Sequence, residues 1–402
     1  MSATSGPDIV SDGLVFYYDT GNRRDSYLGE PTTNIRASSG LNGAYAASGR
    51  TVDNSGTLTA PDGSTGWSSI SSPGSNSDFR IAQFAYNSLS EGSTYSFSLE
   101  LYNPGPNSLE IFVDGNAGQT GTTIPLGYSR WSYTYTVTKV GGGSWAIFFG
   151  AENKQTNASY SPERLIYFKN YQVEEKPHVT PFTAGTRSVS GSLLDISGQG
   201  IDINVSNASF NSSGSMLFDG TDDRVTDIGP VYTRLSGSAT ETVFKVDSIP
   251  NATYAMIFGY KHVGGNYSSF VTGPIAINSS GKIVSSVITS TEVYRYIQSS
   301  TVVQTGKYYH VVLNKDVDEG LLQLYINGKL EATQTFDGPN YPYWAGGNAG
   351  SDYLEIGGLS TSYAWTKFLD GQVDLGKLYS RVLTASEVQQ NYDSLKTRFG
   401  LT

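Results

Sequence analysis

The sequence of 402 residues contains no cysteine, only three histidines and only three methionines. Without cysteine the chain can form neither disulfide bonds nor thiolate metal sites, which excludes a disulfide-stapled scaffold and a cysteine-based zinc site. The histidines, His178, His262 and His310, lie far apart in the sequence. None of them stands four residues from another, so a helical His-x-x-x-His zinc motif is also excluded.

Basic residues are few and form no run. The chain has 26 Lys and Arg against 36 Asp and Glu, which gives a formal net charge of −10. We expect no nucleic-acid partner, because phosphate neutralisation requires clustered cations. We expect no membrane insertion either, because no apolar stretch approaches the ~20 residues of a spanning helix. Residues 1–13 lack the basic and apolar regions of a signal peptide, which predicts synthesis in a cytoplasm.

Glycine (46 residues) and tyrosine (28 residues) are abundant, as are serine, threonine and asparagine. This composition is typical of short β-strands joined by tight turns, so the predicted fold class is all-β. A chain of this length has room for two to three domains, each with its own core.

The clearest hairpin pattern lies at residues 322–335. Asn327 and Gly328 supply the two positive-φ residues of a type I′ turn between two strands. In the first strand, Leu322, Leu324 and Ile326 alternate with polar residues and therefore share one face. We expect this aliphatic face to be buried.

The last residues predict a single short α-helix after the final strand. Thr384 stands at the N-cap with Glu387 at the third helical position, which is a capping box. Val388 and Leu395 fall on one face of this helix, and Gly400 ends it.

Residues 368–400 resemble the last strand and terminal helix of laminin G-like, concanavalin A-like jelly rolls, in the form found in structural proteins of tailed bacteriophages. Residues 215–225 resemble the FDG-x-DD-x-V motif of the same domains, and residues 13–19 resemble their first strand. The turn that normally follows the first strand comes only at residues 194–200. Either a domain is inserted between them, or the first-strand resemblance is accidental. We favour the insertion, because residues 31–187 contain their own set of strand patterns.

The predicted domains follow from this resemblance. Residues 1–12 form a polar N-terminal arm, and residues 13–30 together with 188–402 form a laminin G-like jelly roll. Residues 31–187 form an inserted β-sandwich that resembles carbohydrate-binding modules, with alternating strands such as residues 95–101.

Sugar binding requires exposed aromatic rings with amides and carboxylates beside them. Residues of these types occur in loop-like stretches, and the candidates are Tyr341, Tyr343, Trp344, Asn348, Asp352, Tyr363 and Trp365, together with Trp67 and Tyr86 in the insertion. The alternative is that these aromatic residues form a protein interface or pack within their own loops.

Asp219, Asp222 and Asp223 supply three carboxylates that suit calcium, which the resembling jelly rolls often bind. We favour a structural turn, because Asp219 precedes a glycine and adjacent aspartates point to opposite faces of an extended strand. We therefore predict no cofactor, with calcium as the alternative. We predict no enzyme, because the closely spaced Glu-Asp-Glu alternation of laminarinase-type jelly rolls is absent. Convergence of acids from distant strands stays open.

The resemblance implies a non-enzymatic protein on the virion surface of a tailed phage, as a capsid decoration, a head fibre or part of a tail appendage. Its expected partners are other capsid or tail proteins, further copies of itself and host-surface polysaccharide. A dedicated receptor-binding tail-fibre adhesin is the first alternative, and a polysaccharide-degrading enzyme is the second. The sequence does not distinguish head from tail.

Overall fold

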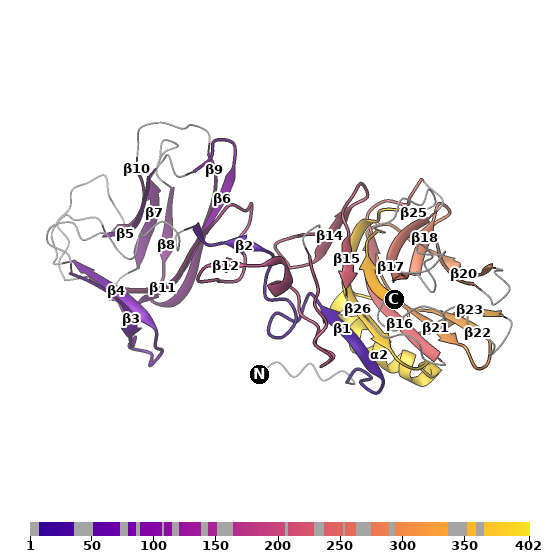
Figure 1. Cartoon of the computed structure of the whole chain (residues 1–402). Helices are drawn as coiled ribbons and strands as arrows, with labels where there is room; N and C mark the ends of the chain where they lie inside the picture. The colour runs from indigo at the N-terminus through magenta and orange to yellow at the C-terminus, as the bar shows by residue number, and fades with distance from the viewer. Residues whose placement is uncertain are drawn as a thin grey trace. The chain divides into compact units, whose positions relative to one another are not determined.

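The computed structural model describes residues 8–35, 51–72, 79–85, 89–106, 108–114, 120–137, 144–150, 164–205, 208–228, 237–251, 254–262, 275–288, 294–336, 352–358 and 366–402. Strands make up most of the regular structure, and the long helix α2 follows the last of them. The predicted all-β class with a short C-terminal helix is confirmed. The chain divides into two compact units, which are unit 1 (Met1–Pro31 and Ser188–Thr402) and unit 2 (Thr32–Arg187) (Figure 1).

Unit 1 is a sandwich of two antiparallel sheets. The first has eight strands, in the order β13 (Ser209–Phe210), β14 (Met216–Asp219), β26 (Asp370–Tyr379), β16 (Gly237–Val246), β21 (Tyr308–Asp316), β22 (Leu321–Ile326) and β23 (Lys329–Thr335), with β1 (Leu14–Asp19) also paired to β26. The second has seven, in the order β15 (Val225–Ile228), β24 (Asp352–Ile356), β17 (Tyr254–His262), β18 (Ile275–Asn278), β19 (Lys282–Ile288) and β20 (Tyr294–Val302), with β25 (Thr366–Lys367) parallel to β17.

The first strand of the chain pairs with its last strand. In β1, Leu14 lies opposite Tyr379 and Asp19 lies opposite Leu375, so β1 occupies the same edge of β26 that β14 occupies nearer its start. Figure 1 shows indigo β1 beside yellow β26. Phe16 and Tyr18 of β1 are fully buried in the core between the two sheets of unit 1. The jelly roll is therefore built from both ends of the chain, with unit 2 between them in the sequence.

The predicted hairpin and helix are both confirmed. Asn327 and Gly328 have φ values of 49° and 79° between β22 and β23, and the aliphatic residues of β22 lie in the core. Helix α2 (Ala385–Phe399) begins with the complete capping box of Thr384 and Glu387, and Gly400 ends it with a φ of 61°.

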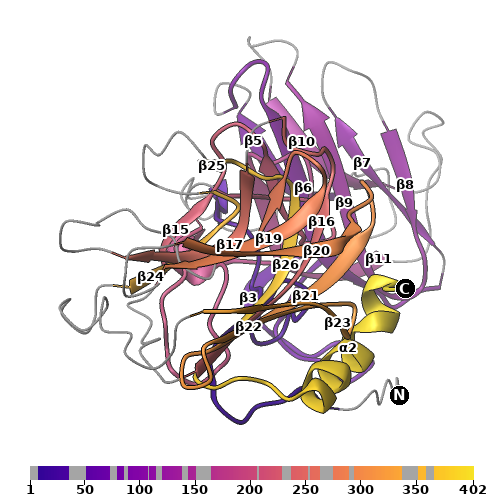
Figure 2. The same cartoon turned by 90° about the vertical axis from the view of Figure 1, so that its right-hand side faces the viewer.

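Helix α2 packs against the outer face of the eight-stranded sheet, and Figure 2 shows it beside β21 and β23. Val388 packs with Val312 and Tyr379 of the sheet. Leu395 packs with Val243 and Leu375 in a second cluster on the same face. The amphipathic pattern of α2 therefore gives this sheet a second apolar layer outside the sandwich core.

Unit 2 is a smaller sandwich with a core of its own. Its five-stranded sheet has the order β3 (Thr51–Leu58), β4 (Trp67–Ser72), β11 (Arg164–Glu174), β6 (Thr94–Asn103) and β9 (Gly127–Thr136). Its four-stranded sheet has the order β5 (Phe79–Ala85), β10 (Ser144–Gly150), β7 (Leu109–Asp114) and β8 (Thr120–Ile124). Among the buried core residues are Phe97, Leu99, Trp131 and Phe168.

The two ends of unit 2 are joined to each other. Strand β2 (Thr32–Thr33) pairs with β12 (Thr186–Arg187). Beside this pair, the buried Glu174 carboxylate accepts hydrogen bonds from Thr32 Oγ1 (3.0 Å), Thr180 N (2.8 Å) and Gln172 Nε2 (2.8 Å). The chain thus leaves unit 2 next to the point where it enters, as an inserted domain requires.

Candidate functional site

The outer face of the large sheet in unit 1 contains a fully buried charged network. Glu241 of β16 accepts from Lys377 Nζ of β26 at 2.8 Å, from His310 Nε2 of β21 at 3.1 Å and from Asn391 Nδ2 of α2 at 2.6 Å. The Tyr379 hydroxyl lies 3.3 Å from the same carboxylate. Three strands and the helix therefore meet at one acid, and His310 is a packed strand residue.

The network also binds the N-terminal arm. Val10 N donates to Asn391 Oδ1 at 2.8 Å, and the Tyr379 hydroxyl donates to the Val10 carbonyl at 3.1 Å. Burial alone would raise the pKa of Glu241, but Lys377 and His310 outweigh it and lower that pKa to about 2. A carboxylate surrounded in this way has no access to a substrate, so we assign the network a structural role.

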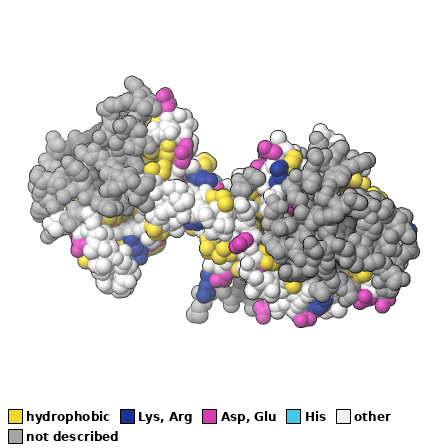
Figure 3. Space-filling view, in the orientation of Figure 1, with side chains coloured by type: hydrophobic (Ala, Val, Ile, Leu, Met, Phe, Trp, Pro, Cys, Tyr) yellow, Lys and Arg dark blue, Asp and Glu magenta, His cyan; other side chains and the backbone are white. Residues whose placement is uncertain are grey.

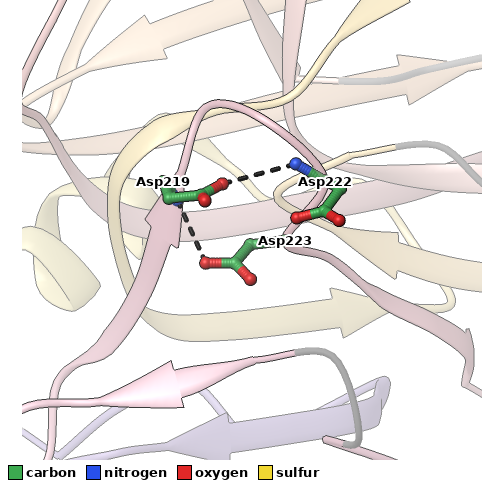
Figure 4. A group of neighbouring side chains, drawn as sticks. All are labelled: Asp219, Asp222 and Asp223. Carbon is green, nitrogen blue, oxygen red and sulfur yellow. Dashed lines mark hydrogen bonds between the residues drawn. The ribbon is translucent and has the colours of Figure 1, made fainter.

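The three aspartates of the predicted turn lie together, Asp219 at the end of β14 and Asp222 and Asp223 in the turn that follows, as Figure 4 shows. Their carboxylate oxygens are within 4.8 Å of one another. This spacing suits a calcium ion bound at about 2.3–2.6 Å from each oxygen. The chemistry of Asp219, Asp222 and Asp223 therefore fits a hard divalent cation.

Backbone amides use the same carboxylates. Asp219 Oδ1 accepts from Thr221 N at 2.8 Å and from Asp222 N at 3.3 Å, while Asp223 Oδ2 accepts from Asp219 N at 3.2 Å. The Thr221 amide lowers the pKa of Asp219, whereas burial and then the Asp219 charge raise the pKa of Asp223. These hydrogen bonds account for the turn without an ion.

Seven of the nine glycan candidates lie outside the described residues, namely Tyr86, Tyr341, Tyr343, Trp344, Asn348, Tyr363 and Trp365. The backbone of Asp352 is described, and it begins β24 opposite His262 of β17. Of the nine, only Asp352 and Trp67 therefore lie within the described part of the chain.

The prediction for Trp67 is corrected by its burial. Its side chain is fully buried at the start of β4, with Lys169 Nζ 4.1 Å from the ring centroid and its Nε1 donating to Ser64 Oγ at 2.9 Å. A ring covered by a lysine has no free face on which a sugar could stack. Trp67 was predicted in a loop-like stretch, whereas it begins β4 and contacts neighbouring side chains.

Three tyrosines that the sequence analysis missed line up across the outer face of the same sheet. Tyr167 of β11 lies directly opposite Tyr102 of β6, and Tyr102 lies directly opposite Tyr128 of β9. We call these three residues the tyrosine row. Tyr128 is 55% exposed, and Tyr102 and Tyr167 are half-buried. Tyr102 meets Tyr167 edge to face at 6.2 Å between ring centroids.

Trp67 contacts two rings of this row. Its ring centroid lies 6.4 Å from that of Tyr102 and 6.5 Å from that of Tyr128, both in edge-to-face geometry. Such contacts fix the orientation of the tyrosine rings, since aromatic pairs prefer this arrangement.

A charged row runs beside the tyrosine row on the same face. Lys169 lies opposite Glu100, and Glu100 lies opposite Arg130. Asn170 Nδ2 donates to Glu100 Oε1 at 2.8 Å, and Lys169 Nζ lies 3.9 Å from Glu100 Oε2. Aromatic faces and hydrogen-bonding groups therefore lie side by side.

Part of this face was detectable in the sequence. In β6, Phe97, Leu99 and Leu101 point to the core, so strict alternation places Glu100 and Tyr102 outward. The alignment of Tyr102 with tyrosines of two other strands depends on register, which alternation within one strand does not specify.

Comparison with known proteins agrees with the fold of unit 1. Residues 219–389 match the family model of the concanavalin A-like lectin/glucanases superfamily. The predicted laminin G-like, concanavalin A-like fold is therefore confirmed for this part of the chain. No protein of curated function matches the chain. The described part of the chain has no helix that is long and apolar enough to cross a membrane.

Solved structures similar to this chain include two toxin domains and a pentraxin. The botulinum neurotoxin serotype D binding domain has a TM-score of 0.40 at 16% identity, covering 53% of this chain and 50% of its own. The type G receptor binding domain has a TM-score of 0.36 at 18% identity, covering 50% and 48%. A heptameric SAP-like pentraxin from Limulus polyphemus has a TM-score of 0.34 at 16% identity, covering 43% and 78%. This chain thus spans about half the length of the two toxin domains.

Proposed function

We propose that this chain is a non-enzymatic surface protein of a tailed-phage virion that displays two lectin-like β-sandwiches and binds host-surface glycans. The observation that supports it most is the construction of the chain. A concanavalin A-like lectin sandwich is closed by the pairing of β1 with β26, and a second sandwich with its own core stands between these strands in the sequence. A chain in which both units are stable β-sandwiches is suited to display.

The surface chemistry is consistent with an exterior position. The net charge of −10 disfavours contact with packaged nucleic acid. On the face drawn in Figure 3, the described Lys and Arg side chains lie scattered among Asp and Glu and form no basic patch. An acidic, mixed surface of this kind keeps a protein soluble in water around a particle.

Two buried acids of the described chain are already engaged. Glu241 in unit 1 and Glu174 in unit 2 each accept several hydrogen bonds from their own unit. Acids held in this way serve packing, which favours binding and display over hydrolysis. The partners that we propose are other capsid or tail proteins, further copies of this chain and host polysaccharide.

The dedicated adhesin is retained as a second candidate because of the tyrosine row. A partly exposed aromatic row flanked by charged groups is the chemistry that sugar recognition uses. In an adhesin this binding would be the main task of the protein, and assembly onto the particle would be secondary.

Two experiments test the proposal. Antibodies against the intact chain are expected to label tailed particles in negative-stain electron microscopy. The position of the label shows whether the protein lies on the head or on the tail. The intact chain is also expected to bind an array of microbial polysaccharides without releasing reducing ends. Particles that stay unlabelled would contradict the virion assignment, and release of reducing ends would establish the enzyme instead.

A further inference from the structure

We propose that the tyrosine row of unit 2 is a binding platform for an uncharged polysaccharide segment, whose sugar rings lie across β11, β6 and β9. This inference rests on the proposed glycan-binding function and assigns it to a particular face. The row offers ring surface, and Glu100, Asn170 and Arg130 beside it offer hydrogen-bonding groups to hydroxyls.

The row lies on a face whose other half is covered by the chain itself. The segment after β11 crosses the other half of this face, where Ser96 Oγ donates to the Lys176 carbonyl at 2.9 Å and Gln172 Nε2 lies 3.2 Å from Thr180 Oγ1. Arg130 Nη2 reaches the Thr180 carbonyl at 3.3 Å, at the border of the covered half. Among the described residues, the chain thus covers the serine-rich half, while Tyr128 stays exposed and Tyr102 and Tyr167 stay half-buried.

The platform is rigid before any ligand arrives. Trp67 contacts two of the three tyrosine rings, and Lys169 Nζ lies over the Trp67 ring. Lys169 Nζ also lies 3.3 Å from the Thr65 carbonyl, so its position is set by the protein. Rings that are already ordered lose little conformational entropy when a ligand stacks on them. Three strands also give the row a span of about two strand spacings, or roughly 10 Å, enough for more than one sugar ring.

The charges of this face indicate that the ligand is uncharged. Lys169 and Arg130 are the two cations of the charged row, and Glu100 lies between them. Hydrogen bonds from Ser64 are the main cause of the lowered pKa of Asp62, and the Lys169 charge contributes to it, which places this carboxylate near Lys169. Asp53 of β3 lies opposite Ser69, and Ser69 lies opposite Tyr167, so a further carboxylate lies at the end of the row. Because cations do not exceed carboxylates here, an anionic sugar gains no net attraction.

The apolar character of the exposed end supports stacking. Tyr128 and nearby Leu126 are each 55% exposed, which places two large apolar side chains at the solvent end of the row. Sugar rings present C–H faces that pack on such surfaces, while their hydroxyls require polar partners at the rim. A protein partner would also bury Tyr128, and that outcome is separated by the test below.

The test uses the intact chain with four defined hexasaccharides, which are cellohexaose, laminarihexaose, maltohexaose and hexagalacturonate, followed by an array of neutral and acidic polysaccharides. We expect at least one neutral glycan to bind and to change the tryptophan fluorescence of the chain, since Trp67 contacts the row. Tyr128→Ala is expected to weaken that binding at least tenfold. The matched control is Tyr296→Ala in unit 1, where the tyrosine is 56% exposed, and it should leave the affinity within twofold.

The possible failures are distinguishable. If the intact chain binds a glycan and Tyr128→Ala binds it equally well, the platform is wrong while the proposed glycan binding stands. If the intact chain binds no glycan at all, both are wrong. If acidic glycans bind more tightly than every neutral one, the charge argument is wrong. Glu100→Gln, which keeps the shape of the side chain, serves as a second variant if Tyr128→Ala does not fold.

Discussion

The outer face of the eight-stranded sheet in unit 1 and the outer face of the five-stranded sheet in unit 2 differ in what covers them. In unit 1, α2 and the N-terminal arm cover the sheet over the Glu241 network. In unit 2, the segment after β11 covers the serine-rich part, and within the described residues Tyr128 of the tyrosine row stays exposed. One face is closed over a buried ion network, and the other exposes an aromatic ring, that of Tyr128, to solvent.

This difference suits the unit 1 face to stability and the unit 2 face to recognition. A buried ion network that is fully satisfied is sensitive to the loss of any member, because the remaining charges are left unpaired away from water. Removing one ring from the tyrosine row should change the free energy of unfolding little, because the neighbouring groups remain solvated. We therefore expect changes at Glu241 to affect folding and changes at Tyr128 to affect binding. The predictions below run from the largest expected effect to the smallest.

Replacing Glu241 by Gln should have the largest effect on stability. The variant keeps the size of the side chain but leaves the Lys377 charge buried without its counter-charge, which costs about 3–5 kcal/mol. Urea denaturation should show this loss in the unfolding free energy of unit 1. Asp393→Asn, which removes a carboxylate from a surface ion pair on α2, is the control and should leave the unfolding free energy close to that of the native chain. Equal stability of the two variants would contradict a structural role for the network.

Acid should weaken unit 1 through the same carboxylate. The pKa of Glu241 is about 2 in the folded protein against an ordinary value of 4.5, so its charged form favours folding. This contribution is fully present above pH 4.5 and is lost as the pH falls toward 2, with a size on the order of 3 kcal/mol. Stability measured by urea denaturation between pH 6 and pH 2.5 should therefore fall for the native chain and fall less for Glu241→Gln. Parallel curves for the two proteins would show that other groups cause the acid loss.

The corresponding acid of unit 2 should have a smaller effect. Glu174→Gln replaces one accepting oxygen by an amide that faces the donors of Thr180 and Thr32. Leaving those buried donors unsatisfied should cost about 1–3 kcal/mol. Calorimetry should show the change in the transition of unit 2 while that of unit 1 keeps its midpoint. A shift of both transitions together would mean that the units do not unfold separately.

Chelation should have the smallest effect of all. The turn of Asp219 and Asp223 is held by backbone hydrogen bonds, so EDTA is expected to shift the melting temperature by less than about 1 °C. Addition of millimolar calcium to EDTA-treated protein provides the reverse test. A rise of several degrees with calcium, abolished by Asp222→Asn, would establish the calcium alternative.

The parts of the fold that sequence alone specified are local. The capping box needs only Thr384 and Glu387, three residues apart, and the hairpin needs only Asn327 and Gly328 between alternating strands. The resemblance at residues 368–400 added the sandwich class, and residues 219–389 match the corresponding family model.

The features that sequence alone did not reveal, structural as well as functional, depend on pairing between distant strands. Glu241 is 136 residues from Lys377 and 69 residues from His310, so nothing local marks the three as partners. The tyrosine row likewise exists only because three strands are in register. Trp67 was misassigned for a related reason, since the lysine that covers it comes from β11, far along the chain.

The most direct test of this division measures unfolding and glycan affinity on the same two variants, Glu241→Gln and Tyr128→Ala, by calorimetry and by titration with the neutral glycan that binds the intact chain. We predict that Glu241→Gln lowers the unit 1 transition and keeps the affinity. We predict that Tyr128→Ala keeps both transitions within about 1 °C and loses at least about tenfold in affinity. A Tyr128→Ala protein that melts several degrees lower while binding as tightly as the native chain would contradict the account.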